Sequence, residues 1–88
     1  MPGPYTVVIV DDHALFAQGL ALLLESRAGE TFRVAGSTTA GEEAVALVGR
    51  NLADVAVVDL ALPPLGGVET IRRIKAAFPD TRVLALSG

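Results

Sequence analysis

The chain alternates short aliphatic runs with longer segments in which apolar residues recur every three or four positions. Short runs rich in Val, Leu and Ile are typical of strands that are buried on both faces of a sheet. Such runs predict strands at residues 6–10, 32–36, 54–60 and 82–86. The helical spacing predicts helices over about residues 14–27, 41–50 and 68–77.

Each predicted helix carries apolar residues that we expect to face a sheet. In the first helix they are Phe16, Leu20, Leu23 and Leu24. In the second, which follows candidate capping residues at 37–39, they are Ala44, Val45, Leu47 and Val48. In the third, which lies between a turn-rich segment at residues 63–67 and Pro79, they are Val68, Ile71, Ile74 and Ala77.

The predicted elements follow the order strand, helix, strand, helix, strand, helix, strand. Short connections between such elements favour right-handed crossovers and a parallel sheet with helices on both faces. The fold class that follows is α/β, with a doubly wound, flavodoxin-like sheet in the strand order 2-1-3-4. In such sheets the ligand site lies at the carboxyl ends of strands 1 and 3, where the winding direction reverses.

The composition and net charge of the chain limit the classes of molecule that we expect it to bind. Hydrophobic residues make up 51% of the chain and aromatic residues only 5%, with a mean hydropathy of +0.51, as suits an aliphatic core. Seven basic and ten acidic residues give a net charge of −3 without a basic cluster, so we expect no nucleic acid partner for this segment. Cysteine is absent and no apolar stretch is long enough for a membrane span, which predicts a soluble, cytoplasmic protein.

Oxygen-bearing side chains stand at the ends of three predicted strands. Asp11 and Asp12 follow strand 1, Asp59 lies near the end of strand 3, and Ser87 follows strand 4. Neighbouring parallel strands lie about 4.8 Å apart, so carboxylates from strands 1 and 3 can converge on one cation. Mg²⁺ is the natural candidate, because it takes a few carboxylate oxygens and leaves sites for water and a phosphoryl oxygen.

Each of these residues also has an explanation without a ligand. An acidic pair before a helix is commonly an N-cap, and an Asp at a strand end is commonly a solvated turn residue. Three carboxylates at one edge nevertheless repel one another unless a cation or a proton intervenes. We interpret His13, which follows the acidic pair, as a first-turn helix residue near the mouth of the site.

The segments VVIVDDHALFAQGLALLLE, VVDLALPPLGG and VLALS resemble a response regulator receiver domain (CheY-like), particularly of the LuxR/NarL type. The resemblance implies that Asp11 and Asp12 hold Mg²⁺, and that Asp59 is both a metal ligand and the nucleophile that accepts a phosphoryl group. It implies a further ligand in the backbone carbonyl of Ala61. It also implies that Ser87 contacts the phosphoryl group and moves on activation. Such a domain is a signalling acceptor and not a turnover enzyme.

The resemblance also implies binding partners for the protein and a receiver domain longer than these residues. The phosphoryl donor would be a sensor histidine kinase, and the output would be a C-terminal helix-turn-helix domain outside this segment. Receiver domains continue through a fourth helix, a fifth strand ending in Lys-Pro and a fifth helix, so residues 1–88 are expected to be the N-terminal portion of one. Lys75, the only lysine, is expected to lie on a solvated helix face and not to replace the lysine of strand 5. With strand 4 as an uncovered edge, we expect the segment to self-associate.

Two other functions compete with this interpretation. An Asp-nucleophile phosphohydrolase would carry an Asp-x-Asp pattern on the strand of its nucleophile, and Asp59-Leu60-Ala61 lacks the second acid. A protein-interaction or dimerisation module that is never phosphorylated is the stronger alternative. Nucleotide binding has no support, because the sequence has neither a P-loop nor a glycine-rich dinucleotide fingerprint.

Overall fold

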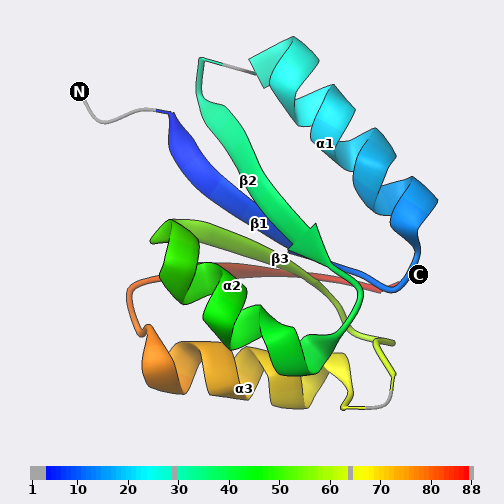
Figure 1. Cartoon of the computed structure of the whole chain (residues 1–88), viewed down its shortest axis with the longest axis vertical. Coiled ribbons are helices and arrows are strands. Elements are labelled where there is room, and N and C mark those ends of the chain that lie inside the picture. The colour runs from blue at the N-terminus through cyan, green and yellow to red at the C-terminus, as the bar shows by residue number, and fades with distance from the viewer. Residues whose placement is uncertain (1–3, 29, 64, 88) are drawn as a thin grey trace.

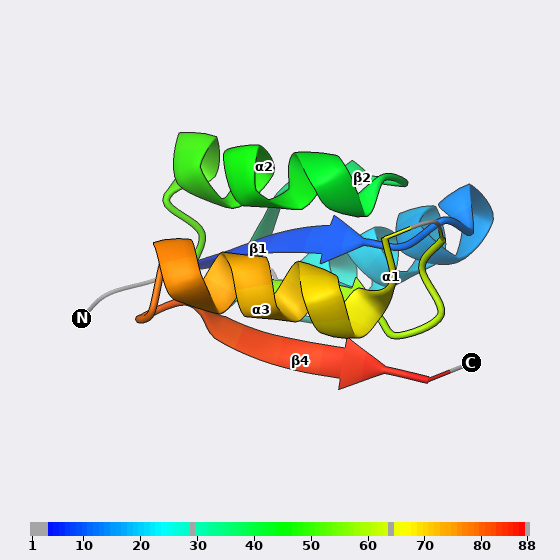
Figure 2. The same ribbon diagram turned by 90° about the horizontal axis from the view of Figure 1, so that it is seen from below.

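The computed structural model describes residues 4–28, 30–63 and 65–87. In chain order the elements are β1 (Tyr5–Val10), α1 (Ala14–Ala28), β2 (Phe32–Thr38), the 3-10 turn η1 (Gly41–Glu43), α2 (Ala44–Asn51), β3 (Val55–Asp59), α3 (Gly67–Ala77) and β4 (Arg82–Leu86). The four strands form one parallel sheet in the order β2-β1-β3-β4. Helices α2 and α3 cover one face of this sheet and α1 covers the other (Figures 1 and 2). The predicted α/β class, doubly wound arrangement and strand order are confirmed.

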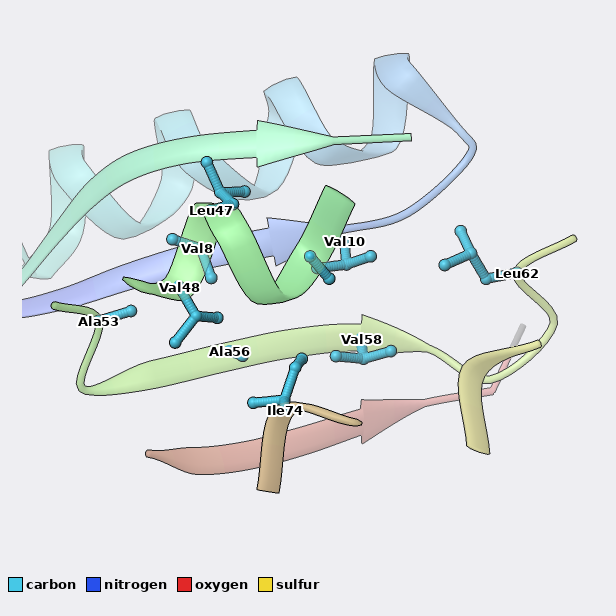
Figure 3. Packing of buried hydrophobic residues seen from close by; sticks show 10 residues of the cluster. Val8, Val10, Leu47, Val48, Ala53, Ala56, Val58, Leu62 and Ile74 are labelled. Carbon is cyan, nitrogen blue, oxygen red and sulfur yellow. The ribbon is translucent and has the colours of Figure 1, made fainter. Parts of the chain in front are cut away.

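The inner strands β1 and β3 are buried on both faces, because successive side chains of a strand point to opposite sides and both strands have neighbours on either side. On the side of α2 and α3, Leu47, Val48 and Ile74 of the helices pack on the strands (Figure 3). The strand residues that they meet are Val8, Val10, Ala56 and Val58. On the side of α1 the buried strand residues are Val7, Ile9 and Val57. This aliphatic core holds the carboxyl ends of β1 and β3 at one edge of the sheet.

Large apolar residues occur around most of helix α1 and are not confined to one face. Ala17 is buried against the sheet, and Leu20 and Leu24 are partly buried beside it. Phe16 and Leu23, which the spacing assigns to the sheet face, are about half exposed. Spacing could not find the correct face because large apolar residues occur around most of the helix, and the residue nearest the sheet is an alanine. In the described part of the chain, no helix is long and apolar enough to cross a membrane.

Helix α3 corrects the prediction at both of its ends. Val68 is 64% exposed and Ala77 is also exposed, although the pattern places both toward the sheet. The buried line runs instead through Gly67, Thr70 and Ile74. Residues three apart on a helix are separated by about 300°, so a series with that spacing alone drifts by about 60° at each step. A face that alternates steps of three and four stays aligned with the sheet.

Two of the three predicted capping residues before the second helix, Ser37 and Thr38, lie in β2, and Thr39 lies in the bend after it. Strand β2 extends to Thr38 because its pairing with β1 continues through Val10 and Thr38. The N-cap of η1 is Ala40, which makes no side-chain capping hydrogen bond. Thr38 still supports this turn, since its Oγ1 accepts a hydrogen bond from the Ala40 N–H and donates one to Glu43. The predicted helix at 41–50 is thus a short 3-10 turn followed by α2.

Strand β3 is shorter than the predicted run by one residue at each end, whereas β4 has the predicted bounds. At the first end, the Asp54 carboxylate accepts a hydrogen bond of 2.8 Å from the Thr6 N–H. At the other end, Leu60 begins the turn that leads to α3. Asp59 is therefore the last residue of β3.

Candidate functional site

The register of the sheet brings the predicted site residues to one edge. Val10 of β1 pairs with Val58 of β3, so Asp11 and Asp59 follow a matched pair on adjacent strands. Asp59 in turn pairs with Leu86 of β4, and Ser87 is the next residue beyond that pair. The convergence predicted from the carboxyl ends of the strands is a direct result of this pairing.

A cavity of about 420 Å³ opens at this edge. It is lined by Asp11, His13, Phe16, Asp59, Ala61, Leu86 and Ser87. The lining therefore includes Asp11, Asp59, Ala61 and Ser87 of the predicted site. Asp12 is not among the lining residues, and its side chain is 32% exposed, so it lies outside the cavity.

The two carboxylates inside the cavity are buried. The side chains of Asp11 and Asp59 are each only 6% exposed. Oδ1 of Asp59 accepts a hydrogen bond of 3.0 Å from the backbone N–H of Ala61, which fixes the orientation of the carboxylate. Within the described residues, Oδ2 of Asp59 accepts no hydrogen bond. One oxygen of this buried group thus remains open to a ligand in the cavity.

His13 lies at the centre of the acidic cluster. Its Nδ1 is 3.0 Å from Oδ1 of Asp11, 3.0 Å from Oδ1 of Asp12 and 3.7 Å from Oδ2 of Asp59. The backbone N–H of His13 also donates a hydrogen bond of 2.8 Å to Oδ1 of Asp11. The ring itself is 70% exposed. The position at the mouth of the site is as expected, but His13 precedes α1 and does not lie in its first turn. Nothing in the sequence indicates that the ring turns inward onto three carboxylates.

The carboxylates raise the pKa of His13 above its ordinary value of 6.5. The main cause is the hydrogen bond to Asp11, which favours the protonated ring. The negative charge of Asp12 adds to this effect.

The donor set of the cluster fits a divalent cation. Asp11, Asp12 and Asp59 each offer a carboxylate oxygen, and these oxygens lie within 4.8 Å of one another and of the His13 ring nitrogen. Ligands on opposite sides of a Mg²⁺ ion with bonds of about 2.1 Å are about 4.2 Å apart. The side chains of the cluster therefore need to approach one another by only roughly half an ångström to bind the ion. Hard carboxylate oxygens beside an open cavity suit Mg²⁺, which retains water or takes a further oxygen ligand.

The loop after β3 holds Asp59 in place through close backbone packing. The N–H of Gly67 donates to the carbonyl of Leu60, and a β-carbon at Gly67 would overlap the backbone carbonyl of Asp59. Gly66, just before, has a φ of 90°, which side chains other than hydrogen rarely allow. Leu62 of the same loop is buried in the core cluster on the side of α2 and α3. The sequence showed Gly67 only as a turn residue, whereas its role here is to let α3 approach the end of β3.

Lys75 lies away from this edge. Its Nζ donates hydrogen bonds of 2.7 Å to the backbone carbonyls of Pro79 and Thr81. Both carbonyls precede β4, whereas the cavity lies at the carboxyl end of that strand. Lys75 therefore stabilises the turn between α3 and β4 and is not part of the site.

Comparisons with known proteins agree with this arrangement. Residues 7–88 match the family model of the response regulator receiver domain. The chain is 35% identical over 81 residues to the response regulator UvrY of Escherichia coli (strain K12), covering 92% of this chain and 36% of UvrY. It is 38% identical over 81 residues to the transcriptional regulatory protein DegU of Brevibacillus brevis, covering 92% of this chain and 34% of DegU. The chain thus spans about a third of the length of these curated relatives.

A solved structure shows the same fold. The two-component response regulator of the LuxR family from Aurantimonas sp. SI85-9A1 superposes with a TM-score of 0.86 at 30% identity, over 97% of this chain and 59% of that one. The family match spans nearly the whole chain and includes the strand ends that form the acidic site. The chain belongs to the response regulator receiver domain family of two-component systems.

Proposed function

We propose that this chain accepts a phosphoryl group on Asp59 from a phosphohistidine of a sensor histidine kinase. The observation that carries the proposal is the state of Asp59: a buried carboxylate with one oxygen fixed by Ala61 and the other facing an open cavity. The carboxylates of Asp11 and Asp12 lie on the neighbouring strand end, where they can hold a cation. This arrangement suits a nucleophile that must approach a negatively charged group.

The reaction is a displacement at phosphorus. Oδ2 of Asp59 forms a bond to phosphorus while the bond from phosphorus to the donor's ring nitrogen breaks, which leaves an acyl phosphate on Asp59. The N–H of Ala61 holds the other carboxylate oxygen and so fixes the direction of attack. Mg²⁺ held by Asp11, Asp12, Asp59 and the backbone carbonyl of Ala61 would neutralise charge on the transferring group. The chain is consumed stoichiometrically in this step, so it is an acceptor and not a turnover enzyme.

Ser87 is the proposed reporter of the modification. It lines the cavity directly after β4, so its hydroxyl can gain a hydrogen bond when phosphate enters. A contact that exists only in the phosphorylated state shifts a two-state element toward that state. In this proposal the change passes, in the cytoplasm, to a helix-turn-helix output domain elsewhere in the full protein and controls transcription.

The test is incubation of the chain with acetyl phosphate and Mg²⁺, followed by mass spectrometry. The expected result is a gain of one phosphoryl group that is absent from Asp59→Asn and present in Asp80→Asn. Asp80 is a suitable control because it is an exposed aspartate in the turn before β4. Circular dichroism checks that both variants keep the fold. Failure of the folded wild-type chain to gain mass would contradict the proposal.

An interaction module that is never phosphorylated is the second candidate. The observation that favours it is the exposed apolar surface, which includes Leu15 and Leu22 of α1 and Leu84 of β4. Concentration-dependent association of a chain that remains unmodified by acetyl phosphate would support this function over the first.

A further inference from the structure

The ring of His13 occupies the space between the carboxylates that a cation would use. Its Nδ1 is within 3.0 Å of oxygens from both Asp11 and Asp12 and within 3.7 Å of Asp59. Asp11 and Asp12 directly follow β1, whereas Asp59 is the last residue of β3, so the ring contacts the ends of both strands. The ring also lines the cavity that the phosphoryl group would enter.

The hydrogen bonds of His13 indicate how its ring is oriented in the acidic cluster. Nδ1 makes a hydrogen bond of 3.0 Å to Oδ1 of Asp11, the same oxygen that accepts the backbone N–H of His13. A metal-ligating nitrogen turns its lone pair toward the ion. Here Nδ1 lies 3.0 Å from a carboxylate oxygen, and because an ionised carboxylate only accepts hydrogen bonds, this contact requires the proton on Nδ1. The Nδ1–H donor exists both in the imidazolium and in one neutral tautomer, so the contact does not require a particular charge on the ring.

The exposure of the ring allows it to leave. The His13 side chain is 70% exposed, while the Asp11 and Asp59 side chains that it covers are 6% exposed. A change of rotamer therefore moves the ring into solvent without opening the core. The buried carboxylates cannot move in the same way.

We propose that the His13 ring occupies the cation position in the metal-free chain. A divalent ion must displace this ring before it binds Asp11, Asp12 and Asp59. This inference rests on the Mg²⁺ role in the proposed function and adds a residue that sets the affinity for the ion. In the absence of Mg²⁺ the ring offsets part of the repulsion among the carboxylates. In its presence the ring competes, so the site loads only at a higher concentration of the ion.

The first test is a calorimetric titration of the chain with Mg²⁺. His13→Ala is expected to bind Mg²⁺ about three- to tenfold more tightly than the wild type, the size expected for losing one partly exposed competing hydrogen bond to a charged group. Leu15→Ala is the matched control, since it shortens an exposed side chain two residues away and should leave the affinity unchanged. Equal affinity of His13→Ala and the wild type, or weaker binding by His13→Ala as expected of a lost ligand, would overturn the inference.

The second test follows the ring itself. His13 is the only histidine, so its imidazole gives one set of NMR signals. Saturation with Mg²⁺ is expected to move these signals to the positions of a free, exposed histidine, and unchanged signals at saturation would overturn the inference. Equal Mg²⁺ affinity in both chains removes this inference and leaves the proposed function standing. Absence of Mg²⁺ binding in both chains removes the metal role from the proposed function and this inference with it.

Discussion

The backbone of Gly67 packs directly on the carbonyl of Asp59, so closely that a β-carbon at position 67 would overlap that carbonyl. The N–H of Gly67 also donates a hydrogen bond of 3.2 Å to the carbonyl of Leu60. The first turn of α3 thereby fixes the backbone at the end of β3. The position of the candidate nucleophile depends on this glycine, although it carries no chemistry of its own.

Replacing Gly67 by alanine should therefore destabilise the fold. The added methyl group meets backbone atoms that cannot rotate away, and we expect a loss of about 1–3 kcal/mol in the free energy of unfolding. Gly19→Ala is the matched control, because a β-carbon there meets nothing within 4 Å and lies inside α1. That variant should gain about 0.5–1 kcal/mol. Urea denaturation of both variants checks the prediction, and equal stabilities would contradict it.

Mg²⁺ should stabilise the folded chain. A ligand that binds only the folded state at ten times its dissociation constant adds about 1.4 kcal/mol to the free energy of unfolding. Asp11→Asn should lose most of this gain, since it removes a buried carboxylate from the cluster. Asp54→Asn should keep it, because Asp54 precedes β3 and lies at the opposite end of that strand. Denaturation with Mg²⁺ and with EDTA measures the difference, and an undiminished gain in Asp11→Asn would exclude Asp11 as a ligand.

The strands and the location of the site follow from the sequence because each rests on a local pattern. Aliphatic runs identify strands that are buried on both faces, and the strand order then places Asp11, Asp59 and Ser87 at one edge. The observed register pairs Val10 with Val58, and because each directly precedes an aspartate, Asp11 and Asp59 lie side by side. A parallel sheet thus converts positions far apart in the chain into neighbours.

Two features of the site depend on tertiary packing and could not be predicted. The direction of the His13 ring results from carboxylates on two different strands, and its position next to Asp12 in the sequence does not distinguish an inward ring from an outward one. The need for glycine at position 67 arises from the approach of α3 to the end of β3, which no turn pattern encodes. The predicted sheet-facing sides of α1 and α3 are partly wrong for a related reason: apolar residues also occupy their exposed faces, as at Leu23 and Val68.

The stability of the chain should depend on pH through His13. Its pKa in the folded chain lies above the ordinary value of 6.5, chiefly because of the hydrogen bond to Asp11. A raised folded-state pKa means that the folded chain binds the proton more tightly than the unfolded chain does. The stabilisation is therefore fully present below pH 6.5 and is lost as the pH rises through the folded-state pKa.

Metal-free NMR titration of the single histidine measures this pKa, and denaturation on both sides of the window measures its effect. Asp11→Asn should bring the pKa of His13 back toward 6.5, because Asp11 is the main cause of the shift. His13→Ala should remove the decline in stability over this pH range. A His13 pKa at or below 6.5 in the wild-type chain would show that the ring does not contact the carboxylates in solution.

The edge strand β4 gives the predicted self-association of this segment a specific structural basis. In the described residues β4 pairs with β3 alone, so its other edge offers backbone hydrogen-bonding groups to a partner. Leu84 of β4 is 56% exposed and, with Phe16 and Leu86, helps to line an apolar hollow of about 220 Å³ between α1 and the sheet. A second copy can pair with the edge and cover the hollow at the same time.

A charge at this edge should therefore prevent association. Leu84→Lys places a cation where a second strand would pair, and we expect sedimentation at high concentration to find a monomer when the wild-type chain forms dimers or larger species. Leu52→Lys is the control, since Leu52 is 82% exposed but lies at the C-cap of α2, away from β4. If association involves nonspecific contacts among exposed leucines, both variants should weaken it equally. Loss in Leu84→Lys alone would assign the contact to β4.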